Sequence, residues 1–341
     1  MTTIASKHVL VTGGASGLGR GLALRCAALG ATVSVLDLNE AGAEEAAATA
    51  AAQGAGTAAG YGCDVGDREQ VVDVAQRVRE AAGPVDILVN NAGVVSGRAL
   101  LELSDEQIEQ TFRVNTLGLF WVTRAFLPAM IERACGYIVV VASAAGLIGT
   151  PRETDYAASK HAAVGFTEAL RLELRRSAPA LRTTTVCPFY IDTGMFAGVK
   201  TRFPRLLPIL REDDVVEAII DAVHFDKPMV ELPWMVRTLP AMRLLPVPAF
   251  DRLAELFGLA AAMDEFRGRD ATASPSAFES VGAPARRSPT TSRFSSSAGD
   301  KGPSACRKAC GTRRSLLSMP GCRATARTSP RRARTRARRR R

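Results

Sequence analysis

The chain has 341 residues, of which 47% are hydrophobic, and its formal net charge is +10. Residues 270–341 hold 18 of the 44 Lys and Arg residues but only 3 of the 34 Asp and Glu residues, which leaves residues 1–269 with a net charge of −5. Because nucleic acid is bound by cations on a fixed surface, no specific nucleic-acid partner is expected for the folded part.

Short β-branched segments alternate with longer helical segments from residue 7 to about residue 232, a pattern typical of βαβ units around a parallel sheet. Several strands are apolar on both faces, so helices are expected to cover both sides of the sheet. Seven strands with six helical connections predict a single doubly wound α/β (Rossmann) domain. The predicted strands are residues 8–12, 32–37, 58–63, 86–90, 137–143, 182–188 and 229–232.

Composition divides the chain into one domain and a tail. The Rossmann domain is predicted over residues 1–268, with a substrate lid at about 189–212 and an apolar C-terminal extension at about 233–263. Residues 269–341 are rich in Arg, Ser and Pro and poor in aliphatic side chains, which predicts a disordered tail. The abrupt change of composition equally fits an out-of-frame or read-through extension.

The first strand is followed by TGGASGLG, which opens an amphipathic helix. In that context Gly13, Gly17 and Gly19 let the backbone approach a pyrophosphate, and the helix N-terminus receives the phosphate charge. The spacing alone also fits a tight strand-to-helix turn. Asp37 ends the second strand, 18 positions after Gly19, near the spacing of an acidic residue that binds a ribose hydroxyl. A carboxylate there repels the extra phosphate of NADP, so NAD is the predicted cofactor.

Two further segments lie at the carboxyl ends of strands, where such sheets bind ligands. CDV follows the third strand and NNAG follows the fourth, and Asp64 is a candidate for the adenine edge. Taken singly, each is also an ordinary turn sequence. The predicted cofactor-binding residues of these segments are Gly13, Ser16, Gly17, Leu18, Gly19, Asp37, Asp64, Val65, Asn91, Ala92 and Gly93.

Tyr156 and Lys160 are four residues apart in a segment with helical apolar spacing, so their side chains share one face. Ser143, predicted to end the fifth strand, lies 13 residues earlier. The segments TGGASGLG, NNAG and YAASK, together with Asp37, Asn115 and Ser143, resemble the classical short-chain dehydrogenases/reductases. The resemblance covers about residues 5–265 and implies an NAD-dependent oxidoreductase acting on CH–OH groups.

The resemblance implies four catalytic residues, Asn115, Ser143, Tyr156 and Lys160, of which the last two also bind cofactor. Tyr156 is expected to take the alcohol proton, so the pKa of its phenol must fall by about 2 to 3 units from about 10. The Lys160 ammonium and the oxidised nicotinamide ring supply the positive charge. Ser143 holds the substrate oxygen, and Asn115 positions a water that relays the proton to Lys160.

The sixth strand leaves through CPFYIDTGMF, where the family usually has Pro-Gly and then Thr. Pro188 and Thr193 match, but Phe189 replaces the glycine, which leaves the local backbone shape and the pocket wall open. The resemblance implies that Thr193 binds the nicotinamide carboxamide, with the Ile191 backbone beside it. No metal site is expected, since the tail has three Cys and no His.

The region after the sixth strand is similar to the subgroup that includes retinol and hydroxysteroid dehydrogenases, which implies a lipophilic alcohol or ketone as substrate. An apolar lid would suit such a ligand, although the same side chains equally fit simple packing on the sheet. Alternatives are a dehydrogenase of small polar alcohols or acyl ketones, and a dinucleotide-sensing scaffold whose basic tail binds nucleic acid or acidic lipid. The lid residues are Phe189, Phe196, Phe203, Leu206, Leu207 and Leu210.

Location and assembly follow from weaker signals. The absence of a secretory signal and of a disulfide framework predicts a cytoplasmic protein. No membrane span is predicted, because no uncharged apolar run reaches the roughly 18 residues needed to cross a bilayer. A peripheral bilayer contact is an alternative to ordinary packing for the apolar extension. The resemblance also implies a homodimer or homotetramer. The residues that suggest bilayer contact are Trp234, Met235, Arg237, Leu239, Met242, Arg243, Leu244 and Leu245.

Overall fold

The computed structural model describes residues 1–54, 57–259 and 261–268. Seven parallel strands form one sheet in the order β3-β2-β1-β4-β5-β6-β7. The doubly wound α/β fold predicted from the sequence is confirmed. The direction in which successive strands are added to the sheet reverses between β1 and β4. The predicted tail at 269–341 lies outside the described residues. The strands are β1 (His8–Thr12), β2 (Thr32–Asp37), β3 (Ala58–Gly62), β4 (Ile87–Asn90), β5 (Tyr137–Val141), β6 (Arg182–Pro188) and β7 (Met229–Leu232).

Three predicted strand boundaries were wrong by one or two residues. Strand β3 ends before Cys63, β4 begins after Asp86, and β5 ends two residues before Ser143. The backbone N–H of Cys63 still donates to Asp37 O at 2.7 Å, so extended pairing continues as the chain turns away. Ser143 instead begins a short 3₁₀ turn, because its hydroxyl accepts a hydrogen bond from Ala145 N.

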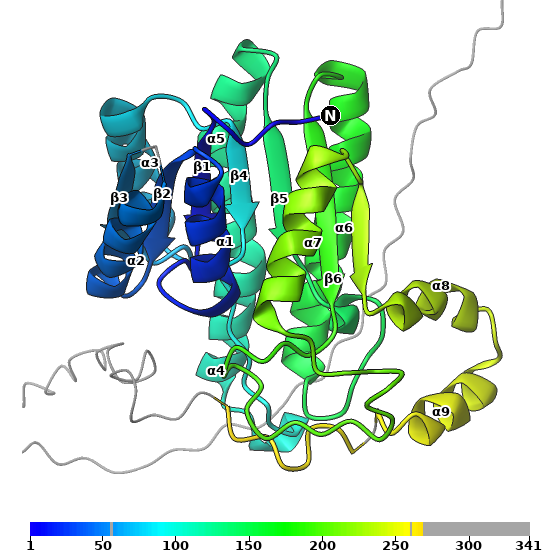
Figure 1. Cartoon of the computed structure of the whole chain (residues 1–341). Coiled ribbons are helices and arrows are strands. Elements are labelled where there is room, and N and C mark those ends of the chain that lie inside the picture. The colour runs from blue at the N-terminus through cyan, green and yellow to red at the C-terminus, as the bar shows by residue number, and fades with distance from the viewer. Residues whose placement is uncertain (55–56, 260, 269–341) are drawn as a thin grey trace, which may run out of the picture. The chain divides into compact units, whose positions relative to one another are not determined.

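Helices cover both faces of the sheet (Figure 1). Val9 and Val11 of β1 pack in the core on the side of α1, α2 and α7, whereas Leu10 between them packs in the core beneath α3, α5 and α6. This alternation is expected for a strand buried on both sides. The helices are α1 (Gly17–Ala28), α2 (Glu40–Gln53), α3 (Arg68–Ala82), α4 (Asp105–Phe112), α5 (Leu119–Glu132), α6 (Thr154–Ser177) and α7 (Glu212–His224).

Helices α4 and α5 are joined by a π-helical segment, Arg113–Gly118, into one helical run. This run, Asp105–Glu132, is long and apolar enough to cross a membrane by length and composition. Its α5 part buries Val122, Phe126 and Met130 in the core beneath the sheet, as the core helix of a folded domain does.

The apolar C-terminal extension predicted at 233–263 follows β7 and lies beside the carboxyl ends of the strands (Figure 1). It forms a 3₁₀ segment, Trp234–Thr238, and the short helices α8 (Leu239–Met242) and α9 (Val247–Leu256). The extension has a buried face and an exposed face: Val236 and Leu239 are buried, while Trp234 and Leu244 are exposed. Its inner face therefore packs on the domain, and its outer face presents apolar side chains.

Candidate active site

The glycine-rich loop between β1 and α1 is shaped by close backbone contacts. Gly13 and Gly17 have φ angles of +65° and +51°, which side-chain-bearing residues rarely adopt. A Cβ on Gly13 would lie 2.8 Å from Ala92 Cα, and a Cβ on Gly19 would overlap the Gly13 carbonyl oxygen. No acidic residue lies in the first turn of α1, and the Ser16 side chain does not cap it. The free N–H groups of this helix terminus are suited to a phosphate.

Thr12 and Asn91 join this loop to the end of β4. The Thr12 hydroxyl accepts from the backbone N–H groups of Asn91 and Ala92 at 3.0 and 3.1 Å. The Asn91 side chain donates to the carbonyl oxygens of Thr12 and Gly13 at 3.0 and 3.1 Å. Asn91, predicted to bind cofactor, therefore also holds the loop in shape. Thr12 was missed, and its place directly before the glycines was the available signal.

The Asp37 carboxylate lies at the end of β2 beside the loop. It accepts hydrogen bonds from Ala15 N and Asn39 N, both at 3.0 Å. Arg20, which directly follows the glycine-rich loop in sequence, forms a 3.4 Å ion pair with Glu45. Asp37 therefore adds a carboxylate to the wall of the cleft, and among the described residues of that wall the only cation is Lys160.

Asp64, which was predicted to bind the adenine edge, already makes contacts within the protein through its carboxylate. Its carboxylate accepts from Gly66 N at 2.8 Å and forms a 3.4 Å ion pair with Arg113. Its side chain still lines the cleft beside Val65.

A cleft of about 270 Å³ runs along the carboxyl ends of the strands. It brings together all the predicted cofactor residues and three of the four predicted catalytic residues, with Asn115 the exception. Among the described residues that line it, Lys160 is the only cation. The predicted residues in its wall are Gly13, Ser16, Gly17, Leu18, Gly19, Asp37, Asp64, Val65, Asn91, Ala92, Gly93, Ser143, Tyr156, Lys160, Ile191 and Thr193.

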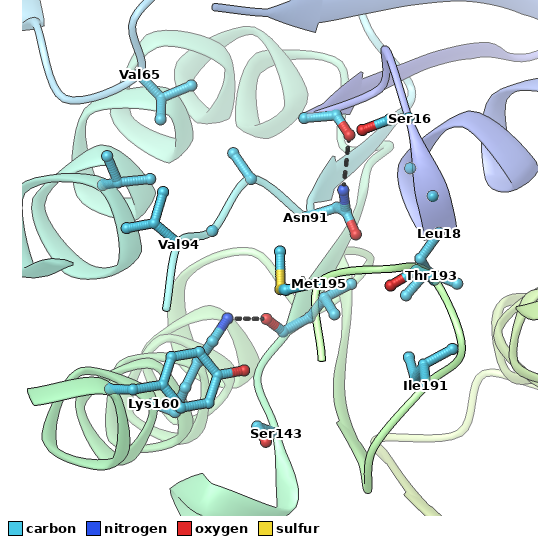
Figure 2. A pocket seen from close by; sticks show the side chains of 18 of the residues that line it. Ser16, Leu18, Val65, Asn91, Val94, Ser143, Lys160, Ile191, Thr193 and Met195 are labelled. Atoms are coloured by element: carbon cyan, nitrogen blue, oxygen red, sulfur yellow. Dashed lines mark hydrogen bonds between the residues drawn. The ribbon is translucent and has the colours of Figure 1, made fainter. Parts of the chain in front are cut away.

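Tyr156 and Lys160 of α6 line the cleft together with Ser143. Figure 2 shows Lys160 and Ser143 in this part of the cleft. Lys160 Nζ donates to the Val141 carbonyl oxygen at 2.9 Å and lies 5.6 Å from the centre of the Tyr156 ring. Burial lowers the pKa of Lys160 to about 8, so its ammonium is retained at neutral pH. Burial, and then the charge of Glu153, raise the pKa of Tyr156, whereas the Ser143 hydroxyl lowers it.

Asn115 lies on the π-helical segment and outside the main cleft. Its side chain accepts from Val94 N at 2.8 Å and donates to Val94 O at 2.9 Å and Ser159 Oγ at 3.0 Å. It therefore clamps the loop after β4 to α6, and it lines a small neighbouring cavity together with Lys160. A Cβ on Gly93 would lie 3.3 Å from Asn115 Oδ1 and 3.4 Å from Lys160 Nζ, so glycine leaves room between these two groups.

The loop after β6 closes the far side of the cleft. Thr193 lies against the start of α1, where a Cβ on Gly17 would be 3.1 Å from Thr193 Cβ. Ile191 pairs with Leu210 in an isolated parallel bridge. Figure 2 shows Ile191, Thr193 and Met195 along this wall.

Aromatic side chains form the substrate end of the cleft. The Phe196 ring lies 5.9 Å from Tyr156 and 5.1 Å from Tyr190, and the Phe189 ring lies 4.5 Å from Tyr190. Of the six predicted lid residues, only Phe189 and Phe196 line the cleft. The prediction included too many residues of the loop. Leu210 packs against the main core and Phe203 packs against Phe257.

Glu153 was not singled out from the sequence. It lies one helical turn before Tyr156 and is only 1% exposed. Its carboxylate accepts hydrogen bonds from the Thr150 hydroxyl and, at 3.5 Å, from the Tyr190 hydroxyl, while Oε1 has no hydrogen-bond partner among the described residues. Burial raises the pKa of this carboxyl to about 7. A charged residue in a polar stretch gives no sequence signal for such burial.

The sequence is similar to those of known dehydrogenases. A profile described as short chain dehydrogenase matches residues 7–202. Mouse "Epidermal retinol dehydrogenase 2" is 40% identical over 268 residues, covering 78% of this chain and 87% of that protein. Rat "Retinol dehydrogenase 10" is 41% identical, covering 72% and 81%. Human "Short-chain dehydrogenase/reductase 3" is 39% identical, covering 78% and 88%.

A solved structure extends the similarity to three dimensions. A short-chain dehydrogenase/reductase from Burkholderia phymatum, crystallised in complex with NAD, superposes with a TM-score of 0.64 and 29% identity. The match covers 72% of this chain and 95% of that one.

Proposed function

We propose that this chain, which belongs to the short-chain dehydrogenase family, uses NAD to oxidise lipophilic alcohols such as retinoids, steroids or long-chain alcohols, or to reduce the matching carbonyl compounds. Membership in the family makes it an oxidoreductase with a nicotinamide cofactor. The observation that carries the proposal is that Ser143, Tyr156 and Lys160 converge at the apolar end of a cleft whose other end is the glycine-rich loop.

The chemistry assigned to the residues is proton transfer. A nicotinamide cofactor bound in the cleft would supply the hydride acceptor or donor. The Tyr156 phenolate takes the hydroxyl proton of the alcohol, and the Ser143 hydroxyl orients the same oxygen. The Lys160 ammonium stabilises the phenolate, held in place by Val141 O. In the protein without cofactor, burial raises the pKa of Tyr156. The positive charge of an oxidised nicotinamide ring would therefore be needed to lower it.

Asn115 is assigned to the relay that returns the proton to solvent through Lys160. Its side chain is engaged with Val94 and Ser159. Its contribution is therefore to hold the water path in shape as well as to bond a water.

NAD is preferred over NADP in this proposal because of charge. The Asp37 carboxylate lies at the ribose end of the cleft, and Arg20 is paired with Glu45. The extra phosphate of NADP would meet a negative charge there, and none of the described residues beside Asp37 supplies a compensating cation, which disfavours NADP.

The lipophilic substrate class is supported by the apolar wall of Phe189, Met195 and Phe196 and by the names of the similar proteins, two of which are retinol dehydrogenases. The test is steady-state kinetics with all-trans-retinol, steroid alcohols, long-chain alcohols and polyols, each with NAD and with NADP. We expect NAD-linked turnover of at least one lipophilic alcohol. Turnover of polyols or small acyl ketones alone would overturn the substrate class.

A peripheral membrane contact is proposed for the outer face of the C-terminal extension. Trp234, Leu244 and Val247 are 61%, 86% and 70% exposed, and Arg243 directly precedes Leu244 in sequence. Such a face suits the surface of an anionic bilayer and would admit a lipid substrate from it. Flotation of residues 1–268 with anionic liposomes tests this, and a matched Leu244→Glu variant should float less. Failure of both proteins to float would reject the contact and leave a cytoplasmic enzyme.

A homodimer or homotetramer is proposed through α5 and α6. Phe120 and Leu172 are exposed on these helices, and the Phe120 ring contacts Phe166 at 4.6 Å. Light scattering of wild type and Phe120→Glu would show a larger species only for the wild type. A monomeric wild type would reject this assembly.

A dinucleotide-sensing scaffold is the competing class of function. Truncation after Gly268 separates the two, because an enzyme should keep its turnover without residues 269–341. Salt-sensitive binding of DNA or acidic lipid that is lost on truncation, in a full chain that turns over no alcohol, would favour the scaffold.

A further inference from the structure

We propose that Phe189 is a specificity-determining residue that sets the length of the substrate's apolar body by closing the catalytic cleft off from a second apolar pocket. This inference rests on the proposed function, because it concerns the lipophilic part of the substrate at the same site.

Phe189 lies between two hollows. It lines the catalytic cleft together with Tyr156 and Ser143, and it also lines a smaller pocket on its other side. Among the described residues it is the only one that lines both. It also belongs to both apolar clusters of this region, the one around Leu239 and the one around Met263. The side chain is therefore a partition rather than one more wall residue.

The second pocket is suited to hydrocarbon. Its volume is about 30 Å³, and its walls come from the inner face of the C-terminal extension, including Met235, Leu239 and Met242. Thr238, its one hydroxyl-bearing residue among those described, already donates to the Met235 carbonyl oxygen at 2.7 Å. A pocket without unsatisfied polar groups does not hold water strongly and gains by accepting methylenes.

The pocket begins close to the reacting groups. Ala144, the residue directly after Ser143, forms part of its wall. A substrate whose oxygen lies at Ser143 and Tyr156 therefore has its apolar body directed either along the main cleft or toward Phe189. In the present conformation the Phe189 ring blocks the second direction.

The partition is anchored through its backbone. Phe189 N donates to the Leu232 carbonyl oxygen at 2.7 Å, and its ring stacks at a tilt against Tyr190. A smaller side chain at this position should leave the backbone in place and remove only the ring. The glycine expected here from family resemblance would join the two hollows, so phenylalanine shortens the space.

The test measures kcat/KM with NAD for saturated primary alcohols of increasing length, in wild type, Phe189→Ala and the milder Phe189→Leu. Removing the ring should move the optimum to longer alcohols, with a gain of about fourfold for each methylene that enters the pocket. Phe189→Leu should give a smaller shift in the same direction.

Two matched variants control for general loosening of the cleft. Phe196→Ala removes a ring that lines the cleft but not the second pocket, so it should lower activity at all lengths without moving the optimum. Adding Met235→Trp to Phe189→Ala refills the pocket and should restore the wild-type profile. An unchanged length optimum in both Phe189 variants, or the same shift in Phe196→Ala, overturns the inference.

Calorimetric titration of the same alcohols in the presence of NAD separates this inference from the proposed function. If no alcohol is turned over but Phe189→Ala still binds longer alcohols more tightly than wild type, the substrate class is wrong and the partition stands. If lipophilic alcohols are turned over and neither binding nor kinetics depends on position 189, the partition is wrong and the function stands.

Discussion

The two ends of the cleft are built by different means. At the proposed cofactor end the shape is made by backbone: Gly13 and Gly17 adopt positive φ angles, and Thr12 and Asn91 tie the loop to the end of β4 by four hydrogen bonds. At the substrate end the shape is made by side-chain packing, with rings such as Phe196 against Tyr190. A backbone site fits one constant ligand, whereas a packed site can be changed by single side chains.

The sharpest difference between the ends concerns chemistry at Tyr156. Tyr156→Phe keeps the ring that packs on Phe196 but removes the proton-transferring hydroxyl. We expect kcat to fall by about 10³-fold or more, since general acid–base catalysis supplies about that much. NAD affinity, measured by fluorescence titration, should stay within a fewfold of wild type. Substantial residual turnover would assign the proton transfer to another group.

The preference for NAD over NADP can be tested by changing the charge at Asp37. Asp37→Ser combined with Leu38→Arg removes the repulsion toward the phosphate of NADP and adds a cation. The ratio of kcat/KM for NADP to that for NAD should rise by about 100-fold. Leu38→Arg alone is the control and should give a smaller rise. An unchanged ratio in the double variant would show that the ribose end lies elsewhere.

Backbone fit at the same end is tested by adding a single carbon. Gly19→Ala places a Cβ against the Gly13 carbonyl oxygen, so we expect NAD affinity to fall by about tenfold and the free energy of unfolding by about 2 kcal/mol. A Cβ on Gly165 of α6 would meet no atom of the described residues within 4 Å outside its own helix backbone, so Gly165→Ala should stabilise the protein by about 0.5 to 1 kcal/mol. Equal effects from both variants would contradict the close approach in the loop.

The pH dependence of stability is expected to reside in Glu153, behind the proposed substrate end. Its pKa is raised by burial to about 7, so folding favours the protonated carboxyl, and stability is lost as pH rises from about 4.5 through 7. The loss amounts to at most about 3 kcal/mol. Glu153→Gln should lack this loss in denaturant titrations between pH 5 and 8.

The same variant should also change the kinetics. The Glu153 charge raises the pKa of Tyr156, so Glu153→Gln should shift the rising limb of the pH–kcat profile for alcohol oxidation to lower pH. Parallel stability curves would show that folding does not raise the pKa of this carboxyl, and identical pH–rate profiles would show that its charge does not affect Tyr156.

The sequence predicted the cofactor end far better than the substrate end. Glycine spacing and strand-end residues such as Asp37 report backbone geometry directly, so this part of the cleft could be located residue by residue. The substrate end depends on which side of a loop packs inward. For that reason Phe203 and Leu210 were expected in the lid but pack elsewhere, and the burial of Glu153 had no signal. Phe189 was noticed as a departure from the family pattern and as one of six lid residues, but its place between two pockets could be seen only in the structure.

The central claim is that Tyr156 ionises near neutral pH when cofactor is bound, although burial raises its pKa in the free protein. Ultraviolet difference titration of the phenolate, with and without NAD, measures this directly in wild type and Tyr156→Phe. The account predicts a phenolate signal in the NAD complex about 2 to 3 pH units below that of an ordinary tyrosine, absent from the variant. No such signal below about pH 10 in the wild-type complex would contradict it.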